Sequence, residues 1–303
     1  MQKKGYLLLC FLAFLGIGLV QAQTSQNVDL FAESNANLSP DITTATFKTT
    51  RIVNGQSIEN VGAGVLDFRI LHRFGPLSQG GYNFYGLDQA TMRIGLDYGI
   101  TSRLMVGIGR STFEKQYDAF LKYRIIRQQS GERNIPFSMS YAGTAIYKSL
   151  KDATTTYTPY ASDKFSFAHQ ILLASKISDY LSIQLTPTLL HYNIVDNATI
   201  PNDFYSLGTG LRLRLSKRVN FITEYYHRYN KLAGYDDPLT MGFDIETGGH
   251  VFQLNVTNST GMTERTFINE TTGTWGKGDI RFGFTISRVF IVSRPKEFRN
   301  NNY

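Results

Sequence analysis

The stretch that decides the fold is Gly278-Asp-Ile-Arg-Phe-Gly-Phe-Thr-Ile-Ser-Arg-Val-Phe290. Its apolar side chains fall at every second position, namely Ile280, Phe282, Phe284 and Ile286. Small or polar residues occupy the positions between them: Asp279, Arg281, Gly283, Thr285 and Ser287. This period of two is typical of a β-strand with one apolar and one polar face. We expect the four apolar residues to face lipid in the closing strand of a membrane β-barrel.

Eleven earlier segments show the same alternation. They lie at about 61–74, 89–99, 104–109, 116–128, 135–149, 164–177, 180–193, 204–216, 219–230, 239–247 and 250–257. With the closing strand they make an even number, as single-chain bacterial barrels require. The sequence therefore predicts an all-β protein, a transmembrane antiparallel up-and-down β-barrel of about twelve strands over residues 61–291.

The links between these segments support the same architecture. Short links, such as 99–103 and 216–218, alternate with long ones, such as 75–88 and 258–278. Tight periplasmic turns and long outer loops produce this alternation, and both chain ends then fall on the periplasmic side. The link at 112–115 is the exception, because it is short where a long one is expected.

Two further features bear on the strands. Pro187 falls inside the seventh segment, and we expect a bulge or local break there because proline lacks the N–H that a closed sheet needs. The competing architecture is a secreted soluble β-sandwich, which also alternates. Strands of five or six residues are typical of a sandwich, whereas segments of about 9 to 14 residues suit a tilted membrane wall better.

Outside the barrel, residues 1–22 are expected to be a cleaved signal peptide, with a basic start, an apolar run and a small-residue cleavage site. Residues 23–60 form a lead-in, in which Asn54-Gly55 is a hairpin signal. This lead-in could be an extra strand, a periplasmic hairpin or a plug inside the barrel. Residues 292–303 are a polar C-terminal tail.

Composition limits the chemistry that the chain can perform. The only cysteine, Cys10, would leave with the signal peptide, and no closely spaced His or Cys set suggests a metal site. Loss of Lys3 and Lys4 lowers the net charge from +7 to +5, and no basic block exists that would bind nucleic acid. We therefore expect no cofactor, no metal and no nucleic-acid partner.

Charged residues mark the polar faces of the segments and are the candidate lumen-lining residues. They are Asp67, Arg69, Arg93, Asp97, Lys122, Arg124, Arg212, Arg214, Glu224, Arg228 and Arg281. They could line a small polar pore, or they could form ion pairs that fill a narrow barrel. A barrel of twelve strands is intermediate between small barrels filled by side chains and large barrels with an open channel. Basic residues outnumber acidic ones, so an open pore would mildly prefer anions.

A catalytic function has less support in the sequence. His250 lies near Asn258 and Ser259, the residue types of an outer-membrane lipase. The pleat would separate His250 from Ser259 by about nine residues of extended chain, and no Gly-x-Ser-x-Gly elbow is present. We expect no enzymatic activity.

Several motifs resemble a known family. They are Phe47-Lys-x-Thr-Arg51, Gly64-x-Leu-x-Phe68 with His72-Arg-Phe-Gly75, Lys115-x-Tyr-Asp118 with Lys122-Tyr123, Gly249-His-Val-Phe-Gln253 and Gly278-Asp-Ile-Arg-Phe-Gly283. Over residues 45–290 the chain resembles domain-of-unknown-function family 5777, β-barrel proteins of Gram-negative outer membranes. The resemblance implies the fold and the location, and it supplies no reaction and no functional residues.

The expected role follows from location and architecture. After export, the barrel-assembly machinery would insert the chain among the lipids of the outer membrane. Its first expected function is a small channel or transport component for polar solutes. The alternative is a non-conducting structural or scaffolding barrel that acts through its loops or an unidentified periplasmic partner.

Overall fold

The computed structural model describes residues 41–293, except for 132, 151–159, 196, 198 and 249. The predicted signal peptide, the lead-in before residue 41 and the tail from residue 294 lie outside the described residues.

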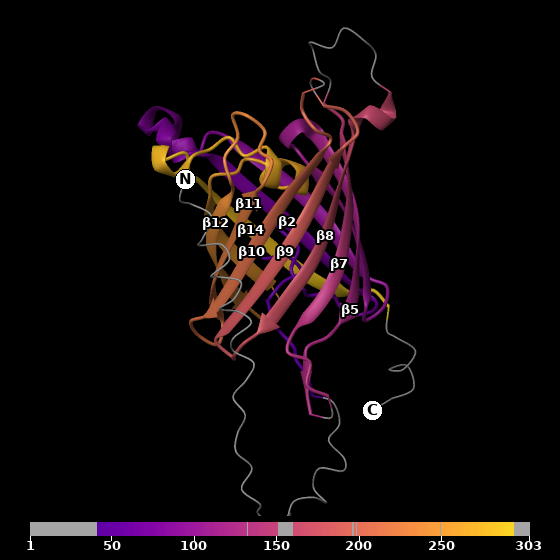
Figure 1. Cartoon of the computed structure of the whole chain (residues 1–303). Helices are drawn as coiled ribbons and strands as arrows, with labels where there is room; N and C mark the ends of the chain where they lie inside the picture. The colour runs from indigo at the N-terminus through magenta and orange to yellow at the C-terminus, as the bar shows by residue number, and fades with distance from the viewer. Residues whose placement is uncertain are drawn as a thin grey trace, which may run out of the picture. The chain divides into compact units, whose positions relative to one another are not determined.

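Twelve long strands of the described chain form one closed antiparallel barrel (Figure 1). They are β2 (Val65–Pro76), β3 (Ala90–Gly99), β4 (Leu104–Ser111), β5 (Gln116–Ile126), β7 (Ser138–Lys148), β8 (Phe165–Lys176), β9 (Leu181–Tyr192), β10 (Asp203–Arg214), β11 (Val219–Arg228), β12 (Leu239–Thr247), β13 (His250–Thr257) and β14 (Arg281–Ile291). Each strand pairs with its sequence neighbours, and β14 pairs with β2. The predicted fold class is confirmed.

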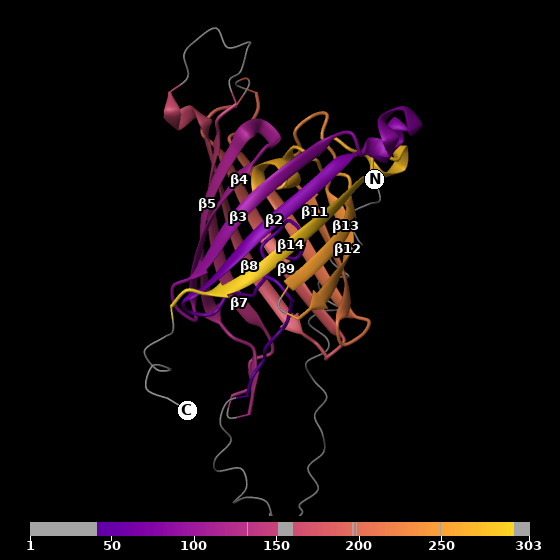
Figure 2. The same cartoon turned by 180° about the vertical axis from the view of Figure 1, so that it is seen from behind.

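The β14–β2 seam closes the barrel in the way the opening stretch predicts. Figure 2 shows β14 in yellow between β13 and β2. Its residues pair from Ile291 with Val65 to Arg281 with Pro76, with one register shift between Arg281 and Gly283. On the outer face, the rings of Phe284 and His72 stack with their centroids 4.8 Å apart.

Burial follows the predicted alternation along the wall. In β14, Arg281, Gly283, Thr285 and Ser287 are buried, whereas the intervening Phe282, Phe284 and Ile286 are partly exposed. Ile280 lies directly before the strand and is also partly exposed. The same contrast separates neighbours in β10, where Arg212 is 2% exposed and Leu213 is 39% exposed. The apolar face therefore points outward all along the seam strand.

Short turns gather at one end of the barrel and longer links at the other. The short-turn end carries residues 100–103, 177–180 and 215–218 and the β12–β13 turn, as well as the longer link from β5 to β7. The long-loop end carries the links from β2 to β3, β4 to β5, β7 to β8, β9 to β10, β11 to β12 and β13 to β14. The short 112–115 link does fall at the long-loop end, so the alternation holds in topology although not in length.

Pro187 interrupts one ladder without shifting its register. It pairs with Leu207 of β10, whose ladder with β9 is continuous. On the β8 side, pairing stops between Gln170–Thr188 and Leu173–Leu185 and resumes in the same register. The local break predicted from the sequence is confirmed, and it carries no bulge.

The remaining elements are short. β1 (Asp41–Ile42) pairs with β6 (Gln129–Ser130) below the barrel in Figure 1. Short helical segments are η2 (Leu77–Gln79), η3 (Gly81–Gly86), η4 (Phe113–Lys115), η5 (Ala161–Lys164), η6 (Arg265–Asn269) and η7 (Trp275–Lys277). Among the described residues, no helix has both the length and the apolar character needed to cross a membrane.

We predict that Phe284→Asp, and separately Phe282→Asp, will block stable insertion. A carboxylate on the outer face of β14 would meet lipid at the seam and cost roughly 1–3 kcal/mol. Heat-modifiable mobility in electrophoresis measures folding of the barrel. Tyr82→Asp, a change in a 96% exposed loop residue, is the matched control and should insert normally. Normal insertion of both Phe variants would contradict the assignment of this face to lipid.

Candidate functional site

From residue 45 onward, the described part of the lead-in lies inside the barrel. Residues 45–61, here called the N-terminal plug, contain a hairpin in which Arg51 bridges to Gln56 and Ile52 N donates to Gly55 O at 2.8 Å. The turn falls at Asn54-Gly55, the hairpin signal of the sequence. All residues from Thr49 to Ile58 are buried. Of the three alternatives for the lead-in, these residues adopt the plug.

Glu224 of β11 holds the turn of the plug through the backbone. Its carboxylate accepts bonds from Val53 N at 3.2 Å, Asn54 N at 2.9 Å and Gly55 N at 3.1 Å, and from Asn54 Nδ2 at 2.8 Å. Bonds from backbone amides to an ionised carboxylate are stronger than those between neutral groups. Gly55 also packs tightly against the Tyr226 hydroxyl, where a Cβ atom would collide. The site therefore requires an acid on the wall and glycine in the turn.

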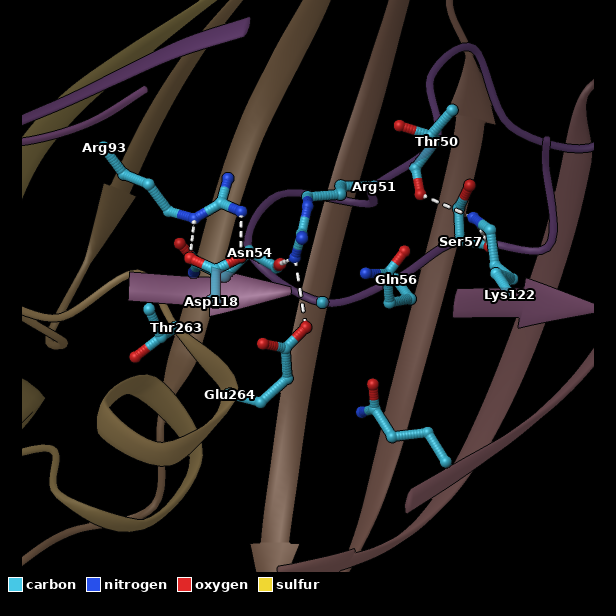
Figure 3. A network of polar contacts seen from close by, with 12 residues as sticks. Thr50, Arg51, Asn54, Gln56, Ser57, Arg93, Asp118, Lys122, Thr263 and Glu264 are labelled. Atoms are coloured by element: carbon cyan, nitrogen blue, oxygen red, sulfur yellow. Dashed lines mark hydrogen bonds and ion pairs between the residues drawn. The ribbon is translucent and has the colours of Figure 1, made fainter. Parts of the chain in front are cut away.

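Lys122 of β5 grips the plug from the other side of the lumen. Its Nζ donates to three plug carbonyls, Thr50 O at 3.1 Å, Ser57 O at 2.9 Å and Glu59 O at 2.6 Å. Figure 3 shows Lys122 reaching the plug beside Thr50 and Ser57. The side chain is fully buried, so its ammonium group depends on these carbonyl oxygens for the solvation that water would otherwise give.

Apolar contacts seat the plug as well. Phe47, Ile52 and Ile58 of the plug pack in one buried cluster with the wall residues Ala142, Leu172 and Ala174. These three wall residues lie on the inward positions of β7 and β8, where most neighbours are polar. The plug thus has one apolar side that fits a matching strip of wall.

A second segment fills the other end of the lumen. Residues 258–280 link β13 to β14, and we call this segment the inward loop. Thr266, Phe267, Ile268 and Asn269 in η6 are at most 1% exposed. The Phe267 ring meets the Tyr226 ring edge-on, with centroids 5.3 Å apart. The inward loop therefore packs into the barrel like part of a protein core.

The two closing segments contact each other. Arg51 Nη1 of the plug lies 3.1 Å from Glu264 Oε1 of the inward loop, and both side chains are 1% exposed (Figure 3). From the wall, Arg73 Nη2 donates to Asn54 Oδ1 at 2.8 Å, and Arg73 Nη1 donates to Gly261 O at 2.8 Å. One wall residue therefore joins the plug to the inward loop.

Ion pairs within the wall complete the network. Arg93 Nε donates to Asp118 Oδ1 at 2.9 Å, and a second bond joins Arg93 Nη2 to Asp118 Oδ2 (Figure 3). Arg69 Nη2 lies 2.9 Å from Asp67 Oδ2. The Arg93–Asp118 pair is bidentate, and Asp67 also accepts a bond from the Ser287 hydroxyl. Because both ion pairs are buried, salt screens them little.

The inward loop carries one further ion pair near its surface end. Arg265 Nε donates to Glu270 Oε1 at 2.9 Å, and the guanidinium lies 4.7 Å from the centre of the Tyr192 ring. Burial raises the pKa of the Glu270 carboxyl group, and Arg265 acts in the opposite direction. The loop thus keeps its charged groups paired where it enters the barrel.

The structure places the predicted lumen residues as follows. Those that are at least nine-tenths buried are Asp67, Arg69, Arg93, Asp97, Lys122, Arg212, Glu224, Arg228 and Arg281. Arg124 and Arg214 occupy the same inward positions near the short-turn end and are half-buried. The plug and the inward loop separate these side chains, so they do not form one continuous channel lining.

The basic excess on the wall has a specific use in this closed state. Arg212 Nη1 donates to Ala45 O at 2.7 Å, Arg228 Nη1 to Asn269 O at 2.9 Å and Arg281 Nη1 to Asn258 O at 3.0 Å. Backbone carbonyls of irregular segments need donors when they are buried. Arginine and lysine supply those donors, which explains why the wall carries more bases than acids.

Residues of the plug and the inward loop were missed as site residues from sequence. They include Arg51, Asn54, Thr263 and Glu264, and on the wall Arg73 and Asp118. The Asn54-Gly55 hairpin signal and the apolar Phe267-Ile268 pair within a polar loop were the available signals. Neither signal shows which wall residues these segments would meet.

The candidate catalytic residues lie far apart. His250 begins β13 at the short-turn end, whereas Ser259 follows the other end of that strand. Ser259 is fully buried, and its Oγ donates to Gly261 O at 3.2 Å. Within the described residues, no group of three or more His, Cys, Asp or Glu side chains could hold a metal ion.

The two larger cavities beside the closing segments lie at opposite ends of the described barrel. One of about 430 Å3 lies at the short-turn end, between the plug and wall residues such as Asp67, Glu246 and His250. Another of about 460 Å3 lies at the long-loop end, lined by residues such as Tyr192, Leu232 and Arg265. They lie at opposite ends, with the buried plug turn and the inward loop between them.

Comparison with known proteins gives a family and a set of structural likenesses. A family model described as "Membrane bound beta barrel domain (DUF5777)" matches residues 47–290. No curated protein matches the chain.

Solved structures with similar folds include the NanC porin, at 9% identity and TM-score 0.47, covering 74% of this chain and 98% of that one. The KdgM porin has 11% identity and TM-score 0.46, covering 75% and 99%. An outer membrane channel from Pseudomonas putida F1 has 13% identity and TM-score 0.43, covering 77% and 98%.

We predict that Glu224→Gln will loosen the plug. The amide keeps one acceptor oxygen but turns an NH2 group toward the backbone N–H groups, which should weaken closure by about 1–3 kcal/mol. Amide hydrogen exchange of residues 53–57, followed by mass spectrometry, should accelerate roughly tenfold or more.

Glu246→Gln is the matched control, because Glu246 pairs with Lys48 at 2.7 Å and its side chain is 45% exposed. Exposed ion pairs contribute about 0–1 kcal/mol, so exchange at the turn should change little. Equal exchange in the wild type and in Glu224→Gln would show that Glu224 does not hold the plug.

Proposed function

This chain belongs to the family of membrane bound beta barrel domains (DUF5777), and we propose that it is a gated pathway for small polar solutes across the outer membrane. The N-terminal plug is the gate in this proposal. The signal peptide would direct export, and the barrel-assembly machinery would insert the chain among outer-membrane lipids. Both chain ends and the short turns would face the periplasm of a Gram-negative bacterium.

The observation that carries the proposal is a set of buried, unpaired hydroxyl groups spread over four neighbouring strands of the wall. Buried Ser140 and Thr144 of β7, Ser166 of β8, Ser182 of β9 and Ser206 of β10 have no hydrogen-bond partner for their hydroxyl groups among the described residues. A permanent core pairs its buried polar groups, and each unpaired group costs about 1–3 kcal/mol. These hydroxyl groups form no hydrogen bonds with the plug, whereas they would form them with water if the plug left the lumen.

The geometry of the plug supports its role as a gate. The chain connects the plug directly to a barrel strand only at the C-terminal end of the plug, through residues 62–64. The inward loop is connected to barrel strands at both of its ends. At the other end of the plug, Thr43 N donates to Gln128 O at 3.0 Å beside the β1–β6 pair. The plug could therefore move out through the short-turn end without a loop passing through the barrel. The chain before it could stay paired with β6.

Withdrawal would expose a polar surface. Gln184 and Gln253 donate to the plug carbonyls Gln56 O and Ile52 O, each at 2.8 Å, and Asp97 accepts from Thr50 Oγ1 at 2.9 Å. Together with Lys122, Glu224 and the wall ion pairs, these groups would face water once the plug leaves. Polar solutes would find donors and acceptors of both signs along this path.

A second candidate function is a barrel that never opens. The ties from Arg51 to Glu264 and from Arg73 to both closing segments favour it, because they make the plug and the inward loop one unit. Such a barrel would be structural or scaffolding and would act through its loops or a periplasmic partner. In both candidates the chain is not an enzyme.

Planar-bilayer conductance of the full-length protein separates the two. We predict that the wild type is mostly silent and that the Lys122→Met, Glu224→Gln double variant conducts steadily, because each of these two wall residues makes at least three bonds to the plug. Reversal potentials in a salt gradient would then show whether the basic wall gives the predicted mild anion preference.

Glu246→Gln is the control and should stay as silent as the wild type. Silence of the double variant, with folding verified by heat-modifiable mobility, would favour the scaffolding barrel. Steady conductance of the wild type at rest would show that the plug does not close the lumen.

A further inference from the structure

The outer wall contains a groove that follows directly from the strand register. Near the long-loop end, one outward row across five strands consists of Ile94, Arg110, Tyr117, Tyr147 and Phe165. The next row toward the short-turn end consists of Leu96, Ile108, Ala119, Ala145 and Phe167. The second row therefore has two small side chains flanked by large ones.

This pattern makes a hollow in the lipid-facing surface. Ala119 and Ala145 pair directly across β5 and β7, so their methyl groups lie side by side at its floor. Ile108 and Phe165 stand on either side, and the hollow has a volume of about 610 Å3, within the range of small-molecule pockets. Its outward side chains are apolar apart from the tyrosine hydroxyls and one arginine.

Arg110 stands at the end of the groove nearest the long loops. Its Nε donates to the Tyr117 hydroxyl at 3.2 Å, and its guanidinium carbon lies 5.4 Å from the centre of the Tyr117 ring. No carboxylate among the described residues forms an ion pair with it. Asp118, the residue after Tyr117, points into the lumen and pairs with Arg93.

The surroundings of Arg110 add positive charge rather than cancel it. Lys115 is exposed in the adjoining turn η4, and the neighbouring Glu114 is already paired with Lys148 at 3.0 Å. Arg110 is therefore a cation at the edge of an apolar hollow, close to the ends of the strands. This arrangement matches a ligand with an apolar chain and an anionic headgroup. A planar guanidinium can bind phosphate oxygens in a bidentate manner.

We propose that this groove binds one lipid with an anionic headgroup, with an acyl chain over Ala119 and Ala145 and its phosphate at Arg110. The rigid wall presents the hollow without rearrangement, so the chain gains packing contacts that a smooth wall lacks. The site is separate from the lumen and does not depend on whether the plug opens.

The test uses the full-length protein in detergent, titrated with dioleoyl phosphatidylglycerol or dioleoyl phosphatidylcholine and followed by native mass spectrometry. The wild type should retain one phosphatidylglycerol with about fivefold preference over phosphatidylcholine, as expected for one arginine at a headgroup. Arg110→Gln should abolish that preference. Ala119→Phe should fill the groove and weaken retention of both lipids by about tenfold, the effect of losing contact with about two methylene groups.

Two controls match these variants. Arg288→Gln removes another outward arginine, whose guanidinium lies 5.0 Å from the Phe290 ring at the short-turn end, and Thr209→Phe enlarges an exposed side chain on β10. Neither should change lipid retention. Ala119→Leu fills the groove less and serves if the Phe variant fails the heat-modifiability check.

Three results would overturn the proposal. They are equal retention of the two lipids by the wild type, unchanged retention in a folded groove-filling variant, and a dimer that the groove-filling variant dissociates while lipid retention stays the same. The last result would assign this face to a second copy of the chain.

Discussion

The closed state of this barrel depends on a single carboxylate that binds peptide N–H groups. Glu224 accepts bonds from three successive backbone amides at the turn of the plug, and Lys122 donates to three plug carbonyls across the lumen. A turn inside a barrel has no ladder to satisfy its backbone, so the wall must supply charged partners. Because these bonds reach the backbone, they place the plug without specifying most of its side chains.

The same requirement accounts for the charge balance of the lumen. Buried carbonyls of the plug and the inward loop are met by Arg212, Arg228 and Arg281, while the acids Asp67 and Asp118 are paired with wall arginines. A basic excess on a polar face is therefore compatible with either an anion path or a filled lumen. In the closed state, the basic side chains donate hydrogen bonds to backbone carbonyl groups of the plug and the inward loop.

Much of the wall could be predicted because each strand repeats one local rule. The predicted segments at 239–247 and 250–257 coincide with β12 and β13, and Pro187 breaks its ladder as expected. The candidate site could be predicted only in part. Glu224 and Lys122 were assigned to the inward face, but their partners 53–55 and 50–59 lie more than sixty residues away, where alternation carries no information.

The sequence by itself determined the strands, their apolar outer faces and the closure of β14 on β2, because a period of two sorts side chains between lipid and lumen. It also placed a hairpin turn at Asn54-Gly55. Only the tertiary structure decided that this hairpin and residues 258–280 fill the lumen, and that Ala119 and Ala145 meet in a groove. Those outcomes depend on contacts between segments distant in sequence, which exist only once the barrel has closed and its register is set.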